Sequence, residues 1–444
     1  MANTYLTRTA GTPTSTQKGT FSAWVKRSSS ADARIFTSWG GGSRQFWLNF
    51  QTDSTDSHIS IADYDGSYNF RYLTNRKFRD FSAFYHIVFA IDTTLGTAGD
   101  RVKLYINGVQ ETSFSVSTAP SQNQVLNFAT SGDAHIIGKR DAEEYFNGSM
   151  SYVAFIDGKQ ELPTIFGETD ATTGEWKIKT TITPTSGWGN VCFFILKNGN
   201  SVTDQSGQSN NFTVGGGTLT KTEDCPSNVF PIFNGMYCPK SSTNAGAFLN
   251  GGTTVGGSPS DASSIASMGA RSGKYYWEIK VQNATNTRSC GVVRSDSIAT
   301  SHGSGIYPGG NGNATIWTVA YNMVNGYVQK NQNGTQSQQG SLATLTTGDI
   351  LGVALNLTDY EIKWYKNNSL VATTSLSADW VAYGNFLLPC NRMDGNQFVQ
   401  YNFGNGYFGT TAVASAGTNA SGNGIFEYDV PSGFTALSTK GLNS

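Results

Sequence analysis

Acidic side chains are the first candidates for catalysis, because many enzymes that cut polysaccharides use two carboxyl groups facing one cleft. On a β-strand such a pair is spaced i and i+2 or i+4, and the motif Glu-x-Asp-x-x-Glu does not occur in this chain. The nearest acidic cluster is Asp141, Glu143 and Glu144 in RDAEEYF, which we interpret as a surface turn. Glu278 in YYWEIKV has no acidic strand partner, and we place it on the solvent face of an outer sheet. The sequence therefore predicts no catalytic residue.

Motifs for nucleophiles and metals are also missing. The chain has no Gly-x-Ser-x-Gly elbow, and we interpret His302 in SHGSG as a loop residue and not as part of a triad. The four histidines are scattered, none neighbours a cysteine, and the five cysteines form no Cys-x-x-Cys pair, so no zinc site is expected. An odd cysteine count without a secretory signal predicts reduced thiols.

Aromatic rings beside Asn, Asp or Arg are the residues that could bind a carbohydrate, because a ring can stack on a sugar while polar groups reach its hydroxyls. Three of them lie in loop-like sequence of the first half, and three lie near Gly- and Asn-rich stretches of the second half. The alternative for each is a core position, which is common for aromatics on strands. The predicted ligand-binding residues are Trp39, Tyr64, Tyr68, Tyr307, Trp317 and Tyr327.

The charge balance argues against two classes of partner. The chain has 30 Lys and Arg against 31 Asp and Glu, a formal charge of −1, so it lacks the basic footprint of a protein that binds nucleic acid or an anionic membrane. It contains no run of about 18 apolar residues that could span a bilayer. Its N-terminal stretch has no apolar segment of a secretory signal, so we expect no export by that route.

Length and composition favour two or three β-domains. The 444 residues include 38% hydrophobic and 12% aromatic residues, enough for real cores, but only 14% charged residues. The 51 glycines are typical of many tight turns between short strands. We therefore predict an all-β protein of two jelly-roll-type antiparallel β-sandwiches joined by an ordered connector.

Strand patterns fill the first 160 residues. Tyr85–Asp92 is apolar on both faces, which indicates a central strand buried on both sides. Asn107-Gly108 is a strong hairpin signal, because both central positions of a type I′ turn need positive φ. The other predicted strands are Thr20–Lys26, Gln45–Phe50, His58–Ala62, Arg101–Ile106, Ala134–Gly138 and Ser149–Ile156.

The order of these pieces resembles the laminin-G-like, concanavalin A-like jelly roll. FSAWVKR, YHIVFAIDTT, RVKLYINGVQ, IIGKR and FNGSMSYVAFIDG follow one another as the corresponding strands do in that family. The resemblance implies a sandwich over residues 1–162, on a fold that serves lectins and glycanases alike. It also implies a calcium ion at one rim, for which Asp53 and Asp56, or Asp63 and Asp65, could supply oxygen ligands; turn capping is the alternative role. No other cofactor is expected.

The second half resembles a SPRY domain. Gly273–Glu278, Gly291–Val293, Gly348–Leu355 and Ile362–Asn368 match the family's motifs in order, and Pro389 with Asn402–Gly404 matches its closing motif. Asn368 stands where glycine is usual. The resemblance implies a sandwich within residues 241–444, of a family that binds proteins and is not enzymatic.

The intervening segment, residues 163–240, resembles the connector of bacteriophage tail-fibre or appendage proteins. It contains FGETDATTGEW, then DQSGQSNNFT, then DCPSN, and the C-terminal VPSGFTALSTKGLN resembles the endings of those proteins. Ile178 replaces the usual proline, and the chain begins directly at the lectin-like domain, which leaves tail or capsid attachment open. The apolar run Val191–Leu196, with Trp176 and Trp188, predicts a connector that packs on a sandwich and does not flex.

Together these features predict a non-enzymatic virion protein of a tailed bacteriophage, made in the bacterial cytoplasm. Its partners would be host-surface carbohydrate or other virion proteins, with no nucleic acid and no membrane insertion. A homo-oligomer is expected, with a trimer as the guess from fibre-like relatives, although no heptads enforce one. Two alternatives remain: a purely structural capsid decoration or tail adaptor protein, and a polysaccharide depolymerase.

Overall fold

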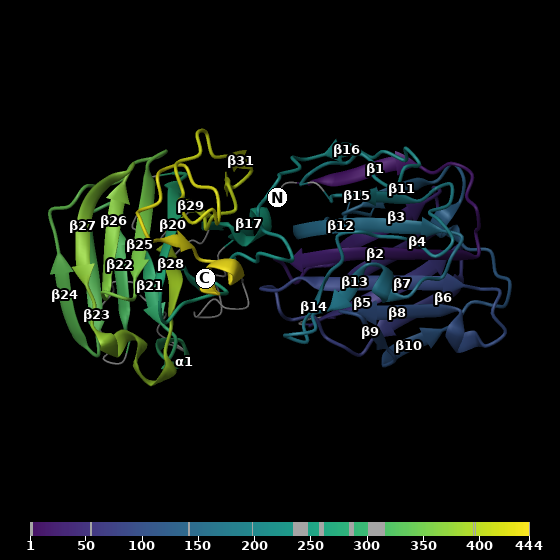
Figure 1. The fold of residues 1–444 in the computed structure, drawn as a ribbon, viewed down its shortest axis with the longest axis horizontal. Coiled ribbons are helices and arrows are strands. Elements are labelled where there is room, and N and C mark those ends of the chain that lie inside the picture. Colours follow the sequence, from purple (N-terminus) through teal and green to yellow (C-terminus); the bar gives the residue numbers. More distant parts are fainter. Residues whose placement is uncertain are drawn as a thin grey trace. The chain divides into compact units, whose positions relative to one another are not determined.

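The computed structural model divides into two compact units, each described here by itself. Unit 1 comprises Met1–Lys221 and Cys225–Ser227, and unit 2 comprises Thr222–Asp224 and Asn228–Ser444. The structure describes residues 3–443 except 54–55, 141–142, 198, 234–246, 257–261, 284–287, 301–315, 394 and 396. The regular secondary structure of both units is mostly antiparallel strands, which confirms the predicted all-β class (Figure 1).

Unit 1 is a sandwich of two sheets. The eight-stranded sheet has the order β10-β6-β5-β4-β3-β11-β1-β16, and the six-stranded sheet has the order β15-β12-β2-β7-β8-β9. A further hairpin is formed by β13 (Gly167–Thr169) and β14 (Trp176–Ile178). The strands of the two sheets are β1 (Tyr5–Thr9), β2 (Lys18–Arg27), β3 (Ala33–Trp39), β4 (Gln45–Asp53), β5 (Asp56–Tyr64), β6 (Tyr68–Thr74), β7 (Tyr85–Asp92), β8 (Val102–Ile106), β9 (Val109–Glu111), β10 (Phe114–Thr118), β11 (Ala134–Ile137), β12 (Gly148–Asp157), β15 (Phe193–Ile195) and β16 (Thr213–Gly216).

The core of unit 1 is a phenylalanine-rich layer between these sheets. Phe21 of the six-stranded sheet stacks on Phe36 of the eight-stranded sheet, with ring centroids 5.0 Å apart, and Phe46 lies 5.1 Å from Phe89. All four rings are fully buried. The period-2 alternation along each strand aims one set of side chains at this layer and the other set away from it.

Residues 163–221 of the connector are part of this sandwich, whereas Thr222–Asp224 and the residues from Asn228 on belong to unit 2. The connector's β15 pairs with β12 at the edge of one sheet, and its β16 pairs with β1 at the edge of the other. Phe193 and Ile195 enter the core, while Phe166 and Ile182 cover the outer face of the six-stranded sheet over Val88 and other apolar residues. The prediction that this segment packs on a sandwich is confirmed, and so is the strand buried on both faces.

Unit 2 is a second sandwich. Its larger sheet has the order β17-β18-β29-β20-β25-β26-β27, with β32 parallel to β20, and its other sheet has the order β19-β28-β21-β22-β23-β24. The strands are β17 (Ala247–Leu249), β18 (Thr254–Gly256), β19 (Ala262–Ile265), β20 (Lys274–Val281), β21 (Arg288–Arg294), β22 (Thr318–Asn322), β23 (Tyr327–Gln332), β24 (Thr335–Gln339), β25 (Ile350–Asn356), β26 (Glu361–Lys366), β27 (Ser369–Ser375), β28 (Leu387–Met393), β29 (Phe398–Asn402), β30 (Tyr407–Phe408), β31 (Thr411–Ala412) and β32 (Thr435–Ala436), with short helices α1 (Ser297–Thr300) and α2 (Thr439–Leu442).

Two hairpin turns that contain asparagine have positive φ at both central residues, and one of them is the predicted turn at Asn107-Gly108. Asn107 and Gly108 have φ of 49° and 78° between β8 and β9. Asn367 and Asn368 have φ of 46° and 71° between β26 and β27, so asparagine replaces glycine there without loss of the turn.

Glu278 overturns one sequence prediction, because it does not face solvent. It is fully buried on β20, and its carboxylate accepts hydrogen bonds from the backbone N–H groups of Glu427 and Tyr428, both at 2.9 Å. Burial raises the pKa of Glu278 to about 7, against the lowering effect of these donors. The side chain therefore fastens the C-terminal segment to the sheet.

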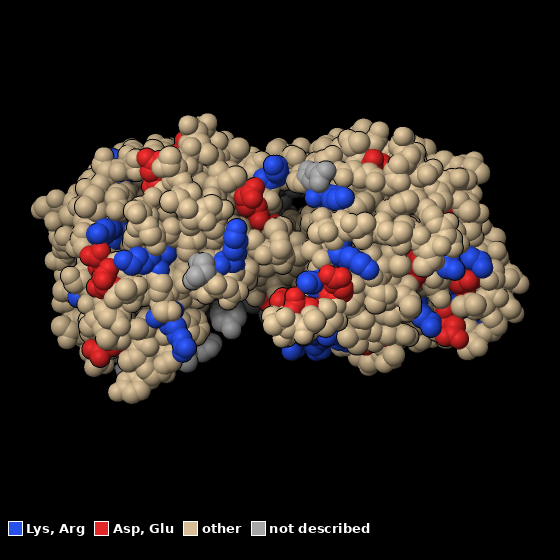
Figure 2. Space-filling view, viewed as in Figure 1, with Lys and Arg blue, Asp and Glu red and all other residues tan. Residues whose placement is uncertain are grey.

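Charged side chains of both signs are interspersed on each unit, on the face drawn in Figure 2. In the part of the chain that the structure describes, no helix is long and apolar enough to cross a membrane.

The connector's contribution to stability can be tested at Phe193. Its ring is fully buried and lies 4.8 Å from Phe212 and 5.8 Å from Phe155, so Phe193→Ala should lower the free energy of unfolding of unit 1 by about 3–5 kcal/mol. Hydrogen exchange followed by mass spectrometry on the full chain would read each unit separately, and faster exchange is expected in β2 and β12 but not in unit 2.

The matched control is Val214→Ala on β16, whose side chain is 44% exposed. It should change stability by no more than about 0.5 kcal/mol. Unchanged exchange in unit 1 of Phe193→Ala would show that the connector is dispensable to the sandwich.

Candidate functional site

The outer face of the eight-stranded sheet, turned away from the core, gathers three of the six aromatic residues predicted to bind a ligand. Along β4, Phe46, Leu48 and Phe50 point into the core, so Gln45, Trp47 and the other alternate residues point outward. The strand register then sets which residues are neighbours on this face. One row across the sheet is Trp39, Gln45, Tyr64 and Tyr68, and the next is Thr37, Trp47, Ala62 and Arg71.

We call Trp39, Trp47, Tyr64 and Tyr68 the aromatic patch. The rings of Tyr64 and Tyr68 meet edge to face with centroids 5.1 Å apart, and those of Trp47 and Tyr68 do so at 6.0 Å. Tyr68 is 46% exposed, Tyr64 and Trp39 are half-buried, and Trp47 is only 8% exposed. The patch is therefore a ring cluster with an accessible top and a buried base.

Arg71 completes the accessible part of this face. Its guanidinium carbon lies 5.0 Å from the centre of the Tyr68 ring, and its Nη2 donates to Gln51 Oε1 at 3.5 Å, at the outer limit for a hydrogen bond. Because Arg71 is on β6 and Gln51 is on β4, the side chain crosses β5 on the outer face. Half-buried Arg71, Gln51 and Gln45 place hydrogen-bonding groups around the rings.

A buried polar row lies beside the patch. Arg34, Asn49 and Ser60 are cross-strand neighbours on β3, β4 and β5, and each is at most 4% exposed. Arg34 Nη1, Asn49 Oδ1, Ser60 Oγ and, on the next row, Arg71 Nε are buried and have no hydrogen-bond partner. Buried polar atoms are usually paired in folded proteins, and others without a partner occur elsewhere in both units, for example Arg8 Nε and Trp277 Nε1.

Asp63 positions the turn that carries Tyr64 and Tyr68. It points inward and is fully buried, accepting from the backbone N–H of Asn127 at 2.6 Å, the Asn127 side chain at 2.8 Å and the Asn69 side chain at 2.7 Å. Burial raises the pKa of Asp63 to about 6, which these hydrogen bonds partly oppose. The residue was considered as a calcium ligand, and the structure shows it bonded to two asparagines.

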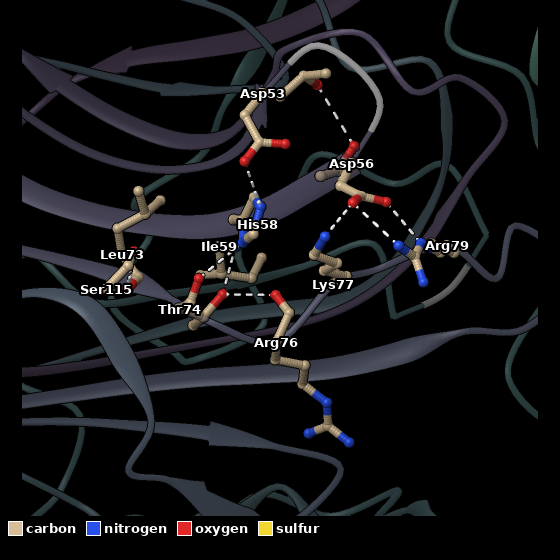
Figure 3. Close-up of polar contacts among 12 residues, drawn as sticks. Asp53, Asp56, His58, Ile59, Leu73, Thr74, Arg76, Lys77, Arg79 and Ser115 are labelled. Atoms are coloured by element: carbon tan, nitrogen blue, oxygen red, sulfur yellow. Dashed lines mark hydrogen bonds and ion pairs between the residues drawn. The ribbon is translucent and has the colours of Figure 1, made fainter.

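Two other calcium candidates, Asp53 and Asp56, also contact protein groups, as Figure 3 shows, whereas Asp65 is exposed. Asp56 lies between Lys77 and Arg79, with Arg79 Nε 2.6 Å from its carboxylate, and hydrogen bonds from Arg79 and Lys77 hold the pKa of Asp56 well below its usual range. Asp53 Oδ2 lies 3.1 Å from His58 Nε2. Among the described residues, no group of three or more His, Cys, Asp or Glu side chains is placed to hold a metal ion.

Of the acidic cluster considered for catalysis, Glu144 is paired with arginines and Glu143 is exposed. Glu144 forms a close bidentate pair with Arg34 and lies 3.1 Å from Arg140 Nη1. Asp141 lies outside the described residues, as does His302. Two arginine side chains therefore hold the Glu144 carboxylate in place.

The candidates of the second half are not brought together. Trp317 is 8% exposed, lies 3.7 Å from the Arg294 guanidinium carbon and 5.2 Å from the ring of Trp380, and immediately precedes β22. Tyr327 pairs with Asn322 at the other end of β22 and accepts a hydrogen bond from its side chain at 2.9 Å. Tyr307 lies outside the described residues.

Trp47 and Arg71 were not predicted as site residues. Trp47 was visible in QFWLNF as an aromatic on the face opposite Phe46 and Leu48, but alternation alone does not say whether that face is covered. Arg71 reaches the patch through pairing of β5 with β6 and through the irregular register between Asp63 and Tyr64. Sequence alone does not reveal that irregularity.

Comparison with known families agrees with this architecture. Residues 1–163 match the model of the concanavalin A-like lectin/glucanases superfamily, and residues 274–405 match the SPRY domain model. Sandwich domains of these kinds point to a binding role. A search of curated proteins found no match.

Solved structures resemble parts of the chain at low identity. The SPRY domain of human HERC1 is 18% identical, with 38% of this chain and 96% of that chain covered and a TM-score of 0.28. The TRIM65 PSpry domain is 14% identical, with 38% and 89% covered and a TM-score of 0.28. The carbohydrate-binding module CBM66 from Bacillus subtilis is 11% identical, with 36% and 88% covered and a TM-score of 0.24.

Asp63 predicts a pH dependence of stability in unit 1. Because its folded pKa is raised from 3.8 to about 6, its contribution is fully present below pH 4 and is lost as the pH rises through 6. Asp63→Asn should remove this component, on the order of 3 kcal/mol, from the free energy of unfolding measured in urea between pH 4 and 7. Asp65→Asn, an exposed position in the same turn, is the control. Equal pH slopes in Asp63→Asn and the natural chain would contradict the assignment.

Proposed function

We propose, from the concanavalin A-like domain and the SPRY domain that the chain carries, that it is a non-enzymatic adhesive protein. Its carbohydrate site would be the aromatic patch of unit 1. We further propose that it works as a component of a tailed-bacteriophage virion, in a tail fibre or appendage, where it would contact host-surface glycan and neighbouring virion proteins.

The observation that carries the carbohydrate proposal is the contiguity of Tyr64, Tyr68 and Trp47 on one sheet face. An exposed ring offers its face to the C–H side of a pyranose, and Tyr68 is held in place by two other rings. Gln45, Gln51 and Arg71 surround it with donors and acceptors suited to sugar hydroxyls. This combination of a flat apolar surface with a polar rim is the usual design of a carbohydrate-binding site.

The virion proposal is supported by the resemblance of the connector to bacteriophage proteins. In the structure the DQSG motif makes specific contacts: Asp204 accepts from the backbone N–H groups of Phe194, Ser206 and Asn210 at 2.8–2.9 Å. The DQSG part of the resemblance therefore lies in residues that build unit 1. We take the resemblance as support for a shared architecture and location, and it does not identify the ligand.

Tyr68→Ala is the direct test of the patch. Removal of the exposed ring should weaken glycan binding by the full chain about tenfold or more, equivalent to about 1.4 kcal/mol, measured on an array of bacterial surface polysaccharides and then by calorimetry. Tyr383→Ala, in which a fully exposed tyrosine of unit 2 is removed, is the matched control and should bind as the natural chain does. Equal binding by Tyr68→Ala and the natural chain would place the site elsewhere.

The same polysaccharides separate adhesion from cleavage. A depolymerase would release reducing ends from the polymer it binds, and Asp141→Asn or Glu144→Gln would abolish that release. We expect binding without release. Measurable release that depends on either carboxylate would replace the adhesive proposal with an enzymatic one.

The virion assignment is tested on purified particles. Mass spectrometry should find this polypeptide in the virion, and its absence would end that proposal. Cryo-electron microscopy of the particle would then distinguish an appendage with an exposed aromatic patch from a capsid decoration or tail adaptor whose patch is covered by neighbouring subunits.

A further inference from the structure

We infer that the ligand of the aromatic patch is an acidic glycan, one that bears a carboxylate such as a uronic acid, recognised by Arg71. This inference rests on the proposed carbohydrate function and names the chemical class that the site takes. It rests on the lack of an acidic partner for Arg71, on the unpartnered polar atoms of the same face and on the position of Arg71 next to Tyr68.

Arg71 is a cation without an acidic partner. Its contacts are the Tyr68 ring and the single amide oxygen of Gln51, and in the described part of the chain it pairs with no carboxylate. Arg34 on the same sheet and Arg140 share Glu144, and Arg44 pairs with Asp133. Arg8 on β1 also lacks a carboxylate partner, but it is buried and its Nη2 donates to the Val191 carbonyl at 2.6 Å. A half-buried guanidinium with unused donors is suited to a bidentate acceptor, and a carboxylate is the acceptor that matches its geometry.

Other polar atoms of the same sheet face also lack a hydrogen-bond partner. Arg71 Nε, the Ser60 hydroxyl and Arg34 Nη1 are buried with no hydrogen-bond partner in the protein, and so is the Asn49 amide oxygen. Arg71 crosses β5, the strand that carries Ser60, so its guanidinium and these atoms belong to one region of the face. All four atoms are buried and Arg34 already pairs with Glu144, so the donors that an anionic ligand would meet are those of half-buried Arg71.

Aromatic and cationic groups are placed for one ligand. Because Arg71 lies 5.0 Å from the Tyr68 ring centre, a sugar stacked on the patch would hold its ring substituents beside the guanidinium. A carboxylate on that sugar would pair with Arg71 in a partly dehydrated site, where charge pairing is stronger than in water. Asp65 is the opposing charge, since it lies exposed in the turn between Tyr64 and Tyr68. Its side chain would repel the same ligand.

The test compares uronic acid-containing bacterial polysaccharides with their carboxyl-reduced forms, in which each carboxylate has become an alcohol and nothing else differs. The full chain should bind at least one acidic polymer ten or more times as tightly as its reduced form. Arg71→Gln should lower binding of the acidic polymer to the level of the reduced one, while Arg71→Lys should retain part of the difference. Asp65→Asn should tighten binding of the acidic form alone.

Controls separate this inference from the proposed function. Arg79→Gln removes an exposed arginine from the same unit, where it pairs with Asp56, and should leave the preference intact (Figure 3). Equal binding of acidic and reduced polymers, both lost in Tyr68→Ala, would overturn the acidic class and leave the carbohydrate site standing. Binding of no polymer, or binding that Tyr68→Ala does not change, would overturn both. Retention of reduced-form binding by Arg71→Gln shows that this variant is folded.

Discussion

The Asp204 carboxylate accepts a hydrogen bond from β15, the edge strand of the six-stranded sheet of unit 1. The connector strand β15 pairs with β12 on one side, and on its other side the N–H of Phe194 would be left open. Asp204 accepts that N–H and the N–H groups of Ser206 and Asn210, while the Gln205 N–H bonds to the Phe194 carbonyl at 2.8 Å. The edge is thus satisfied locally, so the strand can place Phe193 and Ile195 in the core.

The two outer faces of unit 1 differ in how the connector covers them. The connector lies over the six-stranded sheet, where Trp176 Nε1 donates to His86 at 2.9 Å and Phe166 packs on Val88 and Ala90. Burial lowers the pKa of His86 to about 3, so the residue stays neutral beneath the connector. Among the described residues, no comparable apolar cluster covers the outer face of the eight-stranded sheet. Half-buried Gln45, Gln51 and Arg71 lie beside its rings there and leave polar groups accessible to a ligand.

Local signals predicted the elements well, while long-range pairing decided the site. YHIVFAID revealed its central strand because its apolar side chains occupy both faces, and Asn107-Gly108 revealed its hairpin because few residues accept positive φ. Tyr64 and Tyr68 were found because they lie in loop-like sequence beside polar residues. Trp47 and Arg71 were missed because only the register of three strands brings them to those rings.

Glu278 shows that contacts distant in sequence can also bury a residue that its local pattern places on the surface. Its strand alternates apolar and polar side chains as a strand with one solvent-exposed face does. The backbone N–H groups that donate to Glu278 come from residues about 150 positions later in the chain. A lone acidic residue on a strand is usually solvated, and nothing near it in sequence indicates the segment that returns to cover it. Such misreadings are expected wherever a chain terminus folds back onto a sheet.

The placement of the aromatic patch on strands also has consequences for adhesion. Trp47 is held by the Arg34 guanidinium 4.8 Å from its ring, and Asp63 ties the Tyr64–Tyr68 turn to Asn127, so the rings are ordered before any ligand arrives. Pre-ordering reduces the entropy lost on binding, yet the accessible part of the patch is small, and one such site gives modest affinity. Adhesion through it would depend on several copies acting together, which multiplies weak contacts when the geometry allows simultaneous engagement. A rigid, weak and repeated site suits attachment to a polymeric surface better than capture of a free sugar.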